Sequence, residues 1–263
     1  MRLSILLLTL AASCASAQEV RPFASFVELP WRYVIGGYAD GRWLDSQAAG
    51  RRLVAKTSYR LFTLAGEAGR ASAGKASPDA DVCPDVWMQK FTPAPDLKRR
   101  AIGVNAPWEP MPRRPEQLKT DDEALVKAVA RLLAAKGISS PKVRIHQACR
   151  VDLEKAGAPV EIITASHYAN EAELMEALPG DYSLVALRAA GDTSLRLVSG
   201  EFYPVKNPDA APSIHDLAGL LDLNGDGALE ILVHTAYYEG GGMQVWQWRA
   251  GRLEQVLTLD CGV

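Results

Sequence analysis

The sequence predicts a mainly β protein with one covering helix, an α+β fold whose C-terminal half consists of propeller-blade-like antiparallel repeats. Three observations predict it: short apolar runs separated by glycine-containing turns, one amphipathic stretch with helix-capping residues, and a strand pattern that occurs twice. The chain has 263 residues, of which 48% are hydrophobic and 23% charged. This is a globular composition, and the length supports one large or two small cores.

The N-terminus reads MRLSILLLTLAASCASAQ, in which an arginine precedes an apolar run at residues 3–10 and an Ala-x-Ala site ends at Ala17. This order is typical of a secretory signal peptide. We therefore expect residues 1–17 to be removed and the mature chain to begin at Gln18, in the periplasm or secreted. A lipid anchor at Cys14 is the alternative, although the residues before it form a poor lipid-attachment motif. No other stretch approaches the roughly 18 apolar residues that span a bilayer.

The following region is expected to form hairpins and then a proline-rich connector. Asp40-Gly41 lies between two apolar and aromatic runs, and this dipeptide predicts a two-residue hairpin because both turn residues adopt positive φ. The sequence then indicates a strand over 58–66 and a loop rich in Gly, Ala and Ser over 66–79. From Pro84 to Pro115 the density of prolines argues against a helix or a central strand.

One helix is expected, over residues 120–137. Thr120 and Glu123 have the spacing of a capping box, and Gly137 is placed to end the helix. Apolar residues recur on one stripe, so the helix should cover a sheet. The stripe consists of Leu125, Val129, Leu132 and Leu133.

After the helix the chain repeats a pattern. Two segments begin Ile-His, reach Asp-Leu, pass a glycine, and end in a β run that closes on tyrosine; their Asp-Leu pairs begin at Asp152 and Asp222. A repeat of several strands suggests a propeller-type blade, because each unit must bury its face against a neighbour. Two copies do not make a closed propeller. The expected parts are a signal peptide (1–17), a β-hairpin region with its connector (18–119), the helix (120–137), and two blade-like repeats (143–205 and 213–263, within 138–263).

The second copy contains an oxygen-rich loop, DLNGDGALE, at residues 222–230. Alternate residues of a tightly wound loop point inward and the glycine permits the turn, which suits the 6 to 8 oxygen ligands that calcium takes. Magnesium is a worse fit because it requires stricter octahedral geometry. A simple polar turn is the alternative, but it would need neither of the two end residues. The predicted ligands are Asp222, Asn224, Asp226, the carbonyl of Ala228, and Glu230.

The loop is not an EF-hand, because Val233 stands at the twelfth position and the following residues predict a strand. A calcium loop that leads into a strand resembles the FG-GAP and VCBS type of calcium-binding β-propeller repeat, over residues 143–263. The resemblance implies a structural calcium ion. It usually has Asp where Glu230 stands, which makes direct ligation by that residue less certain. In the first copy Ala156 replaces the third carboxylate, so we expect no ion there.

Three cysteines remain after the predicted cleavage. Cys149 lies within a predicted strand, where a small buried thiol is suited, whereas Cys83 lies in loop-like sequence and Cys261 near the C-terminus. We therefore expect a Cys83–Cys261 disulfide, which an oxidising compartment would permit. No CxxC spacing indicates a zinc or thioredoxin-like site.

Charge and motifs limit the function. The formal net charge is −2, and loss of the signal peptide would remove Arg2 and no acid, giving −3, so we expect no nucleic-acid partner. No nucleophile elbow, zinc-helix, P-loop or dinucleotide motif is present. The histidines are expected to have structural roles, and the aromatic residues near the C-terminus could stack on a ligand. These are His146, His167, His215 and His234, and Tyr237, Tyr238, Trp246 and Trp248.

Two functions are therefore expected as alternatives. The first is an exported, calcium-stabilised module without enzymatic activity, which binds a protein or glycan ligand or supports the cell envelope. The second is a periplasmic hydrolase acting on glycan or peptide. A cleft with convergent carboxylates or a Ser-His pair would favour the hydrolase.

Overall fold

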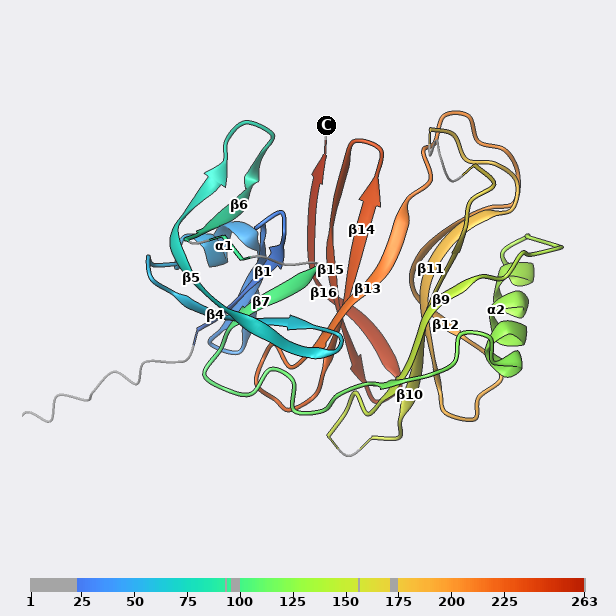
Figure 1. Cartoon of the computed structure of the whole chain (residues 1–263), viewed down its shortest axis with the longest axis horizontal. Helices are drawn as coiled ribbons and strands as arrows, with labels where there is room; N and C mark the ends of the chain where they lie inside the picture. The colour runs from blue at the N-terminus through green and yellow to red at the C-terminus, as the bar shows by residue number, and fades with distance from the viewer. Residues whose placement is uncertain (1–22, 93, 96–99, 156, 171–174, 263) are drawn as a thin grey trace, which may run out of the picture.

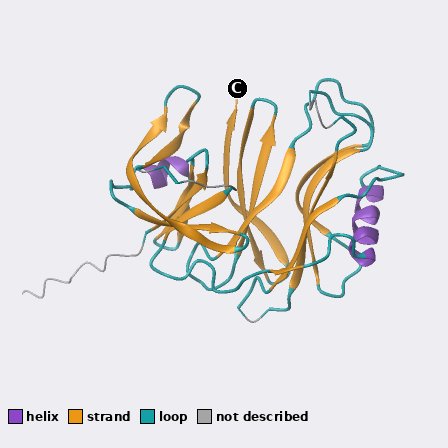
Figure 2. Cartoon of the chain, in the orientation of Figure 1, coloured by secondary structure: helices purple, strands orange, loops and turns teal. Residues whose placement is uncertain are grey.

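A computed structural model describes residues 23–92, 94–95, 100–155, 157–170 and 175–262. The predicted signal peptide, its cleavage site before Gln18 and the alternative anchor at Cys14 lie outside the described residues. Most of the described chain forms antiparallel strands, and two helices are present within it (Figure 2). No described helix is long and apolar enough to cross a membrane.

The first sheet has seven strands in the order β3-β2-β1-β7-β4-β5-β6. Every described pairing within it is antiparallel. Its strands are β1 (Ala24–Leu29), β2 (Val34–Ala39), β3 (Arg42–Leu44), β4 (Ser58–Thr63), β5 (Gly66–Asp79), β6 (Cys83–Phe91) and β7 (Ala101–Asn105), with the short helix α1 (Ser46–Gly50) after β3.

Two further antiparallel sheets follow the first. The second has the order β12-β11-β10-β9-β8 and the third the order β13-β14-β15-β16. The strands of the second are β8 (Glu116–Gln117), β9 (Ile145–Val151), β10 (Val160–His167), β11 (Asp181–Ala189) and β12 (Arg196–Tyr203). Those of the third are β13 (Ile214–Leu221), β14 (Glu230–Tyr237), β15 (Gly240–Arg249) and β16 (Arg252–Gly262).

The three sheets pack in succession, and the four-stranded sheet lies between the other two (Figure 1). One face of this middle sheet contributes Leu221, Leu232 and Val245 to a core shared with the seven-stranded sheet. The opposite face contributes Ile231 and Val233, among others, to a core shared with the five-stranded sheet. Because both faces are covered, β14 is apolar over most of its length rather than alternating, as expected of a strand buried on both sides.

Helix α2 (Glu123–Ala135) covers the outer face of the five-stranded sheet, as predicted (Figure 1). Its apolar stripe buries Leu125, Val129 and Leu133. The predicted cap is wrong by two residues: Asp122, not Thr120, accepts the N–H groups of the first turn. A carboxylate at that position also suits the positive end of the helix dipole.

Two predictions for the N-terminal region are wrong. Residues 66–79, expected to be a loop, form β5, which pairs with β4 on one side and β6 on the other. The proline-rich segment contains β6 and also β7, which lies between β1 and β4. The residues of β7, Ala101–Asn105, include no proline, so this part of the segment can form a strand. In both β5 and β7, pairing with neighbouring strands outweighs the local sequence signal.

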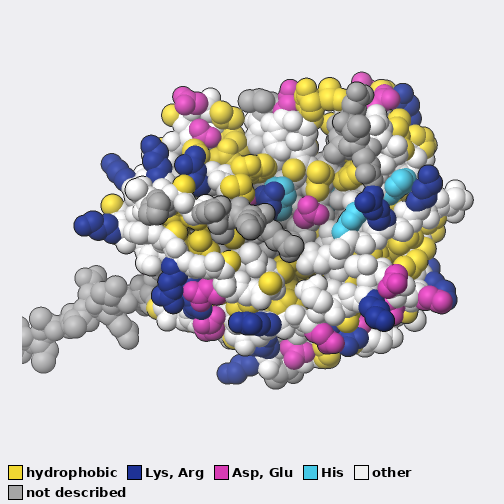
Figure 3. Space-filling model, viewed as in Figure 1, with side chains coloured by type: hydrophobic (Ala, Val, Ile, Leu, Met, Phe, Trp, Pro, Cys, Tyr) yellow, Lys and Arg dark blue, Asp and Glu magenta, His cyan; other side chains and the backbone are white. Residues whose placement is uncertain are grey.

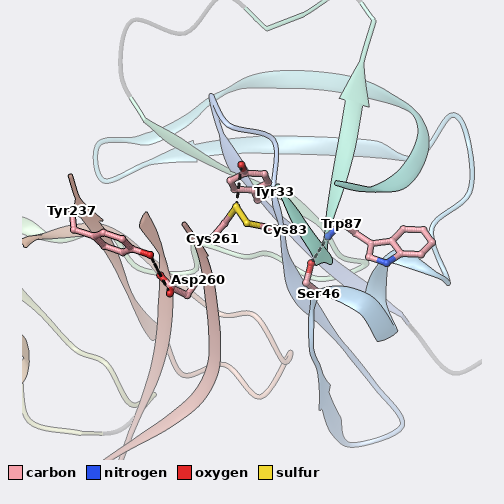
Figure 4. Close-up of a disulfide and its surroundings, with 7 residues drawn as sticks. All are labelled: Tyr33, Ser46, Cys83, Trp87, Tyr237, Asp260 and Cys261. Atoms are coloured by element: carbon pink, nitrogen blue, oxygen red, sulfur yellow. Dashed lines mark hydrogen bonds between the residues drawn. A yellow bond between two sulfur atoms is a disulfide. The ribbon is translucent and has the colours of Figure 1, made fainter. Parts of the chain in front are cut away.

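Two other predictions are confirmed. Asp40 and Gly41 join β2 to β3 with φ values of 55° and 75°, as the hairpin requires. Cys83 and Cys261 form a disulfide, with Cα atoms 5.7 Å apart, and Cys149 is an unpaired buried thiol. The bridge joins β6 of the first sheet to β16 of the middle sheet (Figure 4).

The fold class is thus confirmed at the level of a mainly β protein with antiparallel sheets and a covering helix. Strands β9–β12 and β13–β16 form two antiparallel meanders, one after the other in the chain. The described residues form no closed barrel or propeller. That the two meanders are copies of one repeat stays a prediction.

Candidate metal centre

The predicted calcium loop joins β13 to β14 in the middle sheet. Asp222 follows the last residue of β13, and Glu230 is the first residue of β14. Gly225 and Gly227 adopt φ values of 77° and 82°. These values favour glycine, so the two glycines let the chain turn twice within the loop.

Short hydrogen bonds between side chains and backbone fix the shape of this loop. The carboxylate of Asp222 accepts the N–H of Gly225 at 2.7 Å and that of Gly227 at 2.9 Å. Asn224 Oδ1 accepts the N–H of Asp226 at 3.0 Å, and Asp226 Oδ1 accepts the N–H of Ala228 at 2.8 Å. The loop is therefore a series of local turns capped by its own acidic and amide side chains.

Glu230 lies at the bottom of the loop and is fully buried. Its carboxylate accepts the N–H of Leu223 at 2.7 Å, the side-chain amide of Gln247 at 3.1 Å and the guanidinium of Arg249 at 3.0 Å. The same Arg249 Nη2 lies 2.6 Å from Asp226 Oδ2. One guanidinium thus bridges two of the three predicted acidic ligands.

Two residues of the proline-rich segment hold the loop from outside. Trp108 donates its indole N–H to the carbonyl of Asp222 at 2.9 Å, and a methyl group on Gly225 would lie 3.0 Å from the indole ring. Arg113 donates to the carbonyl of Gly227 at 2.7 Å. Neither residue can be assigned to the loop from the sequence, because the contacts span 114 positions of the chain.

Burial alters the acidity of two loop carboxyls. It raises the pKa of Glu230 to about 7, opposed by the Leu223 N–H, Gln247 and Arg249. It also raises the pKa of Asp222, opposed by the N–H groups of Gly225 and Gly227. A buried carboxyl prefers its neutral form unless a nearby cation stabilises the carboxylate, so a cation in the loop would favour the charged form of both residues.

The donor set fits calcium in its chemistry, with three carboxylates and one amide oxygen within nine residues. The present arrangement of the donors is different, because no three acidic, histidine or cysteine side chains among the described residues gather as a metal-binding group. In this arrangement Arg249 engages Asp226 and Glu230, and backbone N–H groups engage both carboxylate oxygens of Asp222. Calcium binding would require this guanidinium to leave Asp226.

The corresponding loop of the first meander lies against the loop of the second meander. Leu229 donates its N–H to the carbonyl of Leu153 at 2.7 Å. Glu154 accepts the N–H of Ala250, which directly follows β15, at 3.1 Å. Ala156 lies outside the described residues, and Glu161 is buried against Arg188 at 2.7 Å.

The histidines differ in their surroundings. His215 is buried and pairs with Ser199 at 2.8 Å, and His234 is buried against the Trp31 ring, with centroids 5.3 Å apart. His146 is exposed and its Nε2 lies 2.7 Å from Ser166 Oγ. The expected structural role therefore suits His215 and His234, whereas His146 lines a large cleft.

The aromatic residues near the C-terminus also differ. Tyr238 is 62% exposed, while Trp248 is buried in the core between the four- and five-stranded sheets, with Trp246 packed against that core. Tyr237 directs its hydroxyl at Asp260, and near it Tyr33 lies against the disulfide (Figure 4). Of the four aromatic residues, the tryptophans are thus excluded as an open stacking surface.

No family model, no curated protein and no solved structure matches the chain. The likeness to FG-GAP and VCBS repeats therefore stays a prediction that rests on the loop sequence.

Proposed function

We propose that this chain is an exported, non-enzymatic binding module, or an envelope structural module, whose loop 222–230 takes up one structural calcium ion. The observation that carries the proposal is the loop itself. Its acidic and amide side chains are already held in place by local hydrogen bonds, and two of its carboxylates share a single cation, Arg249.

Asp222, Asn224, Asp226, the Ala228 carbonyl and Glu230 would hold the ion. Calcium would supply positive charge to a site in which two of the three carboxyls, those of Asp222 and Glu230, are buried. Trp108 and Arg113 hold the loop backbone in place, and Arg249 neutralises Asp226 and Glu230. The role proposed for the ion is to stabilise the junction of the two meanders, where the loops touch.

Calorimetry and thermal unfolding test the proposal. We expect one calcium ion per chain, with a dissociation constant of about 0.1 to 1 mM, because a bidentate twelfth ligand is absent. At a tenfold excess over this constant the ion would stabilise the fold by about 1.4 kcal/mol.

A pair of variants makes the test specific to the loop. Asp226→Ala should abolish the calcium-dependent rise in melting temperature. Glu154→Ala, in the loop of the first meander, should retain it. Absence of calcium binding at millimolar concentrations, or equal loss in both variants, would refute the proposal.

Export is a separate part of the proposal, supported by the N-terminal sequence and compatible with the disulfide. Mass spectrometry of the protein from the envelope fraction should find Gln18 as the first residue. A diacylated Cys14 would contradict this and favour the lipid anchor.

One observation favours the hydrolase as a second candidate: Ser166 Oγ lies 2.7 Å from His146 Nε2, and His146 lines the same cleft as Asp216. No hydrogen bond joins His146 to Asp216 among the described residues, so a complete catalytic triad is not formed. A fluorophosphonate probe distinguishes the two functions. Labelling that depends on Ser166 would establish the hydrolase, and lack of labelling would favour the binding module.

A further inference from the structure

A cleft of about 840 Å³ lies where the three sheets meet. The turn between β4 and β5, the segment before β8, and strands β9, β10 and β13 supply its walls. Its volume lies in the range typical of small-molecule sites. A row of basic, acidic and histidine side chains crosses the middle of the face in Figure 3. The polar residues that matter here are Arg100, Arg114, His146, Thr164 and Asp216.

Asp216 is the one acidic residue among the described lining residues. It is exposed to the cleft and has no hydrogen-bond or ion-pair partner in the described part of the chain. The basic residues that act electrostatically on it are Arg100 and His146. Arg100 is already engaged by the buried carboxylate of Glu28 and stacks on Trp31, so it does not neutralise Asp216 alone.

Arg114 supplies the opposite charge. It comes from the segment before β8, and its guanidinium lies over Gly66, where an added methyl group would be 3.5 Å from Cζ. No described residue accepts a hydrogen bond from it or pairs with it. A guanidinium without a protein partner in a cleft is suited to bind a carboxylate in bidentate fashion.

Thr164 provides an independent indication of a ligand. Thr164 is 2% exposed and lines the cleft from β10, and its buried Oγ1 has no hydrogen-bond partner in the described structure, so a ligand would meet this hydroxyl once the side chain turns toward the cleft. A buried hydroxyl without a partner is costly, and groups of this kind in native proteins usually serve a ligand or a water molecule.

We propose that this cleft binds short peptides with free termini, with the peptide carboxylate on Arg114, its ammonium group on Asp216, and a peptide group on the Thr164 hydroxyl. One unpaired positive and one unpaired negative group match a zwitterion better than an anion or a cation. None of the described lining residues is Phe, Tyr or Trp, so a broad stacking platform for a sugar or a base is lacking there. The inference gives the proposed binding module a partner and does not involve the calcium loop, which shares no residue with the cleft.

Calorimetry with tripeptides tests this, using trialanine, Ala-Ser-Ala and Ala-Leu-Ala with free termini. At least one should bind at millimolar or lower concentration, while its N-acetylated and C-amidated forms should bind at least tenfold more weakly. The measurement is repeated with and without calcium, so that loss of calcium binding and loss of peptide binding are scored separately. Absence of tripeptide binding, equal binding of the capped forms, or equal binding of free alanine would overturn the proposal.

Variants assign the ends of the peptide. Asp216→Asn should lower the affinity for the free peptide at least tenfold, and it should bind the free and N-acetylated peptides equally. Arg114→Gln should lower the affinity to the same extent, and it should bind the free and C-amidated peptides equally. Thr164→Val keeps the shape of the side chain, so it should weaken binding several-fold without lowering the melting temperature. Asp209→Asn and Arg252→Gln, exposed residues outside the cleft, are the matched controls and should bind as the wild type does. Discrimination that persists in both cleft variants would refute the assignment.

Discussion

His234 shows how a single residue can make the fold sensitive to pH. It is 3% exposed within β14, and neither ring nitrogen has a hydrogen-bond partner among the described residues. Burial lowers its pKa to about 3, and electrostatic repulsion from Arg100 and from a proton on His215 acts in the same direction. An unfolded histidine takes up its proton near pH 6.5. Between these two values the unfolded chain therefore binds more protons than the folded chain does.

Stability should consequently fall as the pH drops below 6.5, at a cost on the order of 2 kcal/mol at pH 5 from this residue. His234→Phe keeps a ring against Trp31 and removes the titration, so its unfolding free energy should change less between pH 7 and pH 5. Urea unfolding at the two pH values measures this. His146→Gln, on an exposed residue, is the control and should keep the wild-type dependence. An unchanged slope in His234→Phe would contradict the prediction.

At the scale of the element, both meanders contain a buried glutamate held by an arginine at the end of the third strand. Glu161, in β10, lies 2.7 Å from Arg188 in β11, and Glu230, in β14, lies 3.0 Å from Arg249 in β15. The Glu161–Arg188 pair lies beside a loop that lacks the full set of predicted calcium ligands. Pairing of a buried glutamate with an arginine therefore does not depend on a metal. This supports the interpretation of the meanders as related units.

Local sequence predicts an element where its own residues determine it. The hairpin at Asp40-Gly41 follows from turn chemistry, and helix α2 follows from its apolar stripe although its N-cap is Asp122 and not the predicted Thr120. Strand β5 could not be predicted, because its small residues have little strand propensity and are ordered by pairing on both sides. Arg249 was likewise not assigned to the loop, since the sequence does not show which side chain a neighbouring strand delivers.

The arginine pairs also give an element-scale prediction. Arg249→Gln leaves Glu230 buried without its cation, so it should destabilise the calcium-free protein by about 1–3 kcal/mol. If calcium binds the loop, the same substitution removes a competitor and should tighten calcium binding about tenfold. Arg188→Gln is the matched control, since it should destabilise the fold and leave calcium affinity unchanged. Calorimetry and urea unfolding of both variants check this, and equal calcium affinity in wild type and Arg249→Gln would contradict it.

The whole molecule is a stack of three sheets and a helix in which the middle sheet has both faces buried. The last strand, β16, belongs to this middle sheet, while the first sheet is formed by the beginning of the chain. Contacts between sheets are therefore distant in sequence, and the chain must close long loops to form them. Apart from the backbone, the disulfide is the one covalent link between sheets in the described chain, joining residues 178 positions apart.

This bridge should contribute about 5 kcal/mol, because in the chain-entropy model it removes the freedom of a very long loop from the unfolded chain. The variant with both Cys83→Ser and Cys261→Ser should lose up to this amount in urea unfolding, and dithiothreitol should lower the stability of the wild type but not of that variant. Cys149→Ala separates the bridge from the buried thiol: its stability should fall with dithiothreitol just as that of the wild type does. Since Cys149 lies wholly within the core between the middle and five-stranded sheets, it has no access to either bridged cysteine in the folded chain. Non-reducing peptide mapping that finds Cys149 in a disulfide, or a wild type indifferent to reduction, would contradict this account of how the sheets are joined.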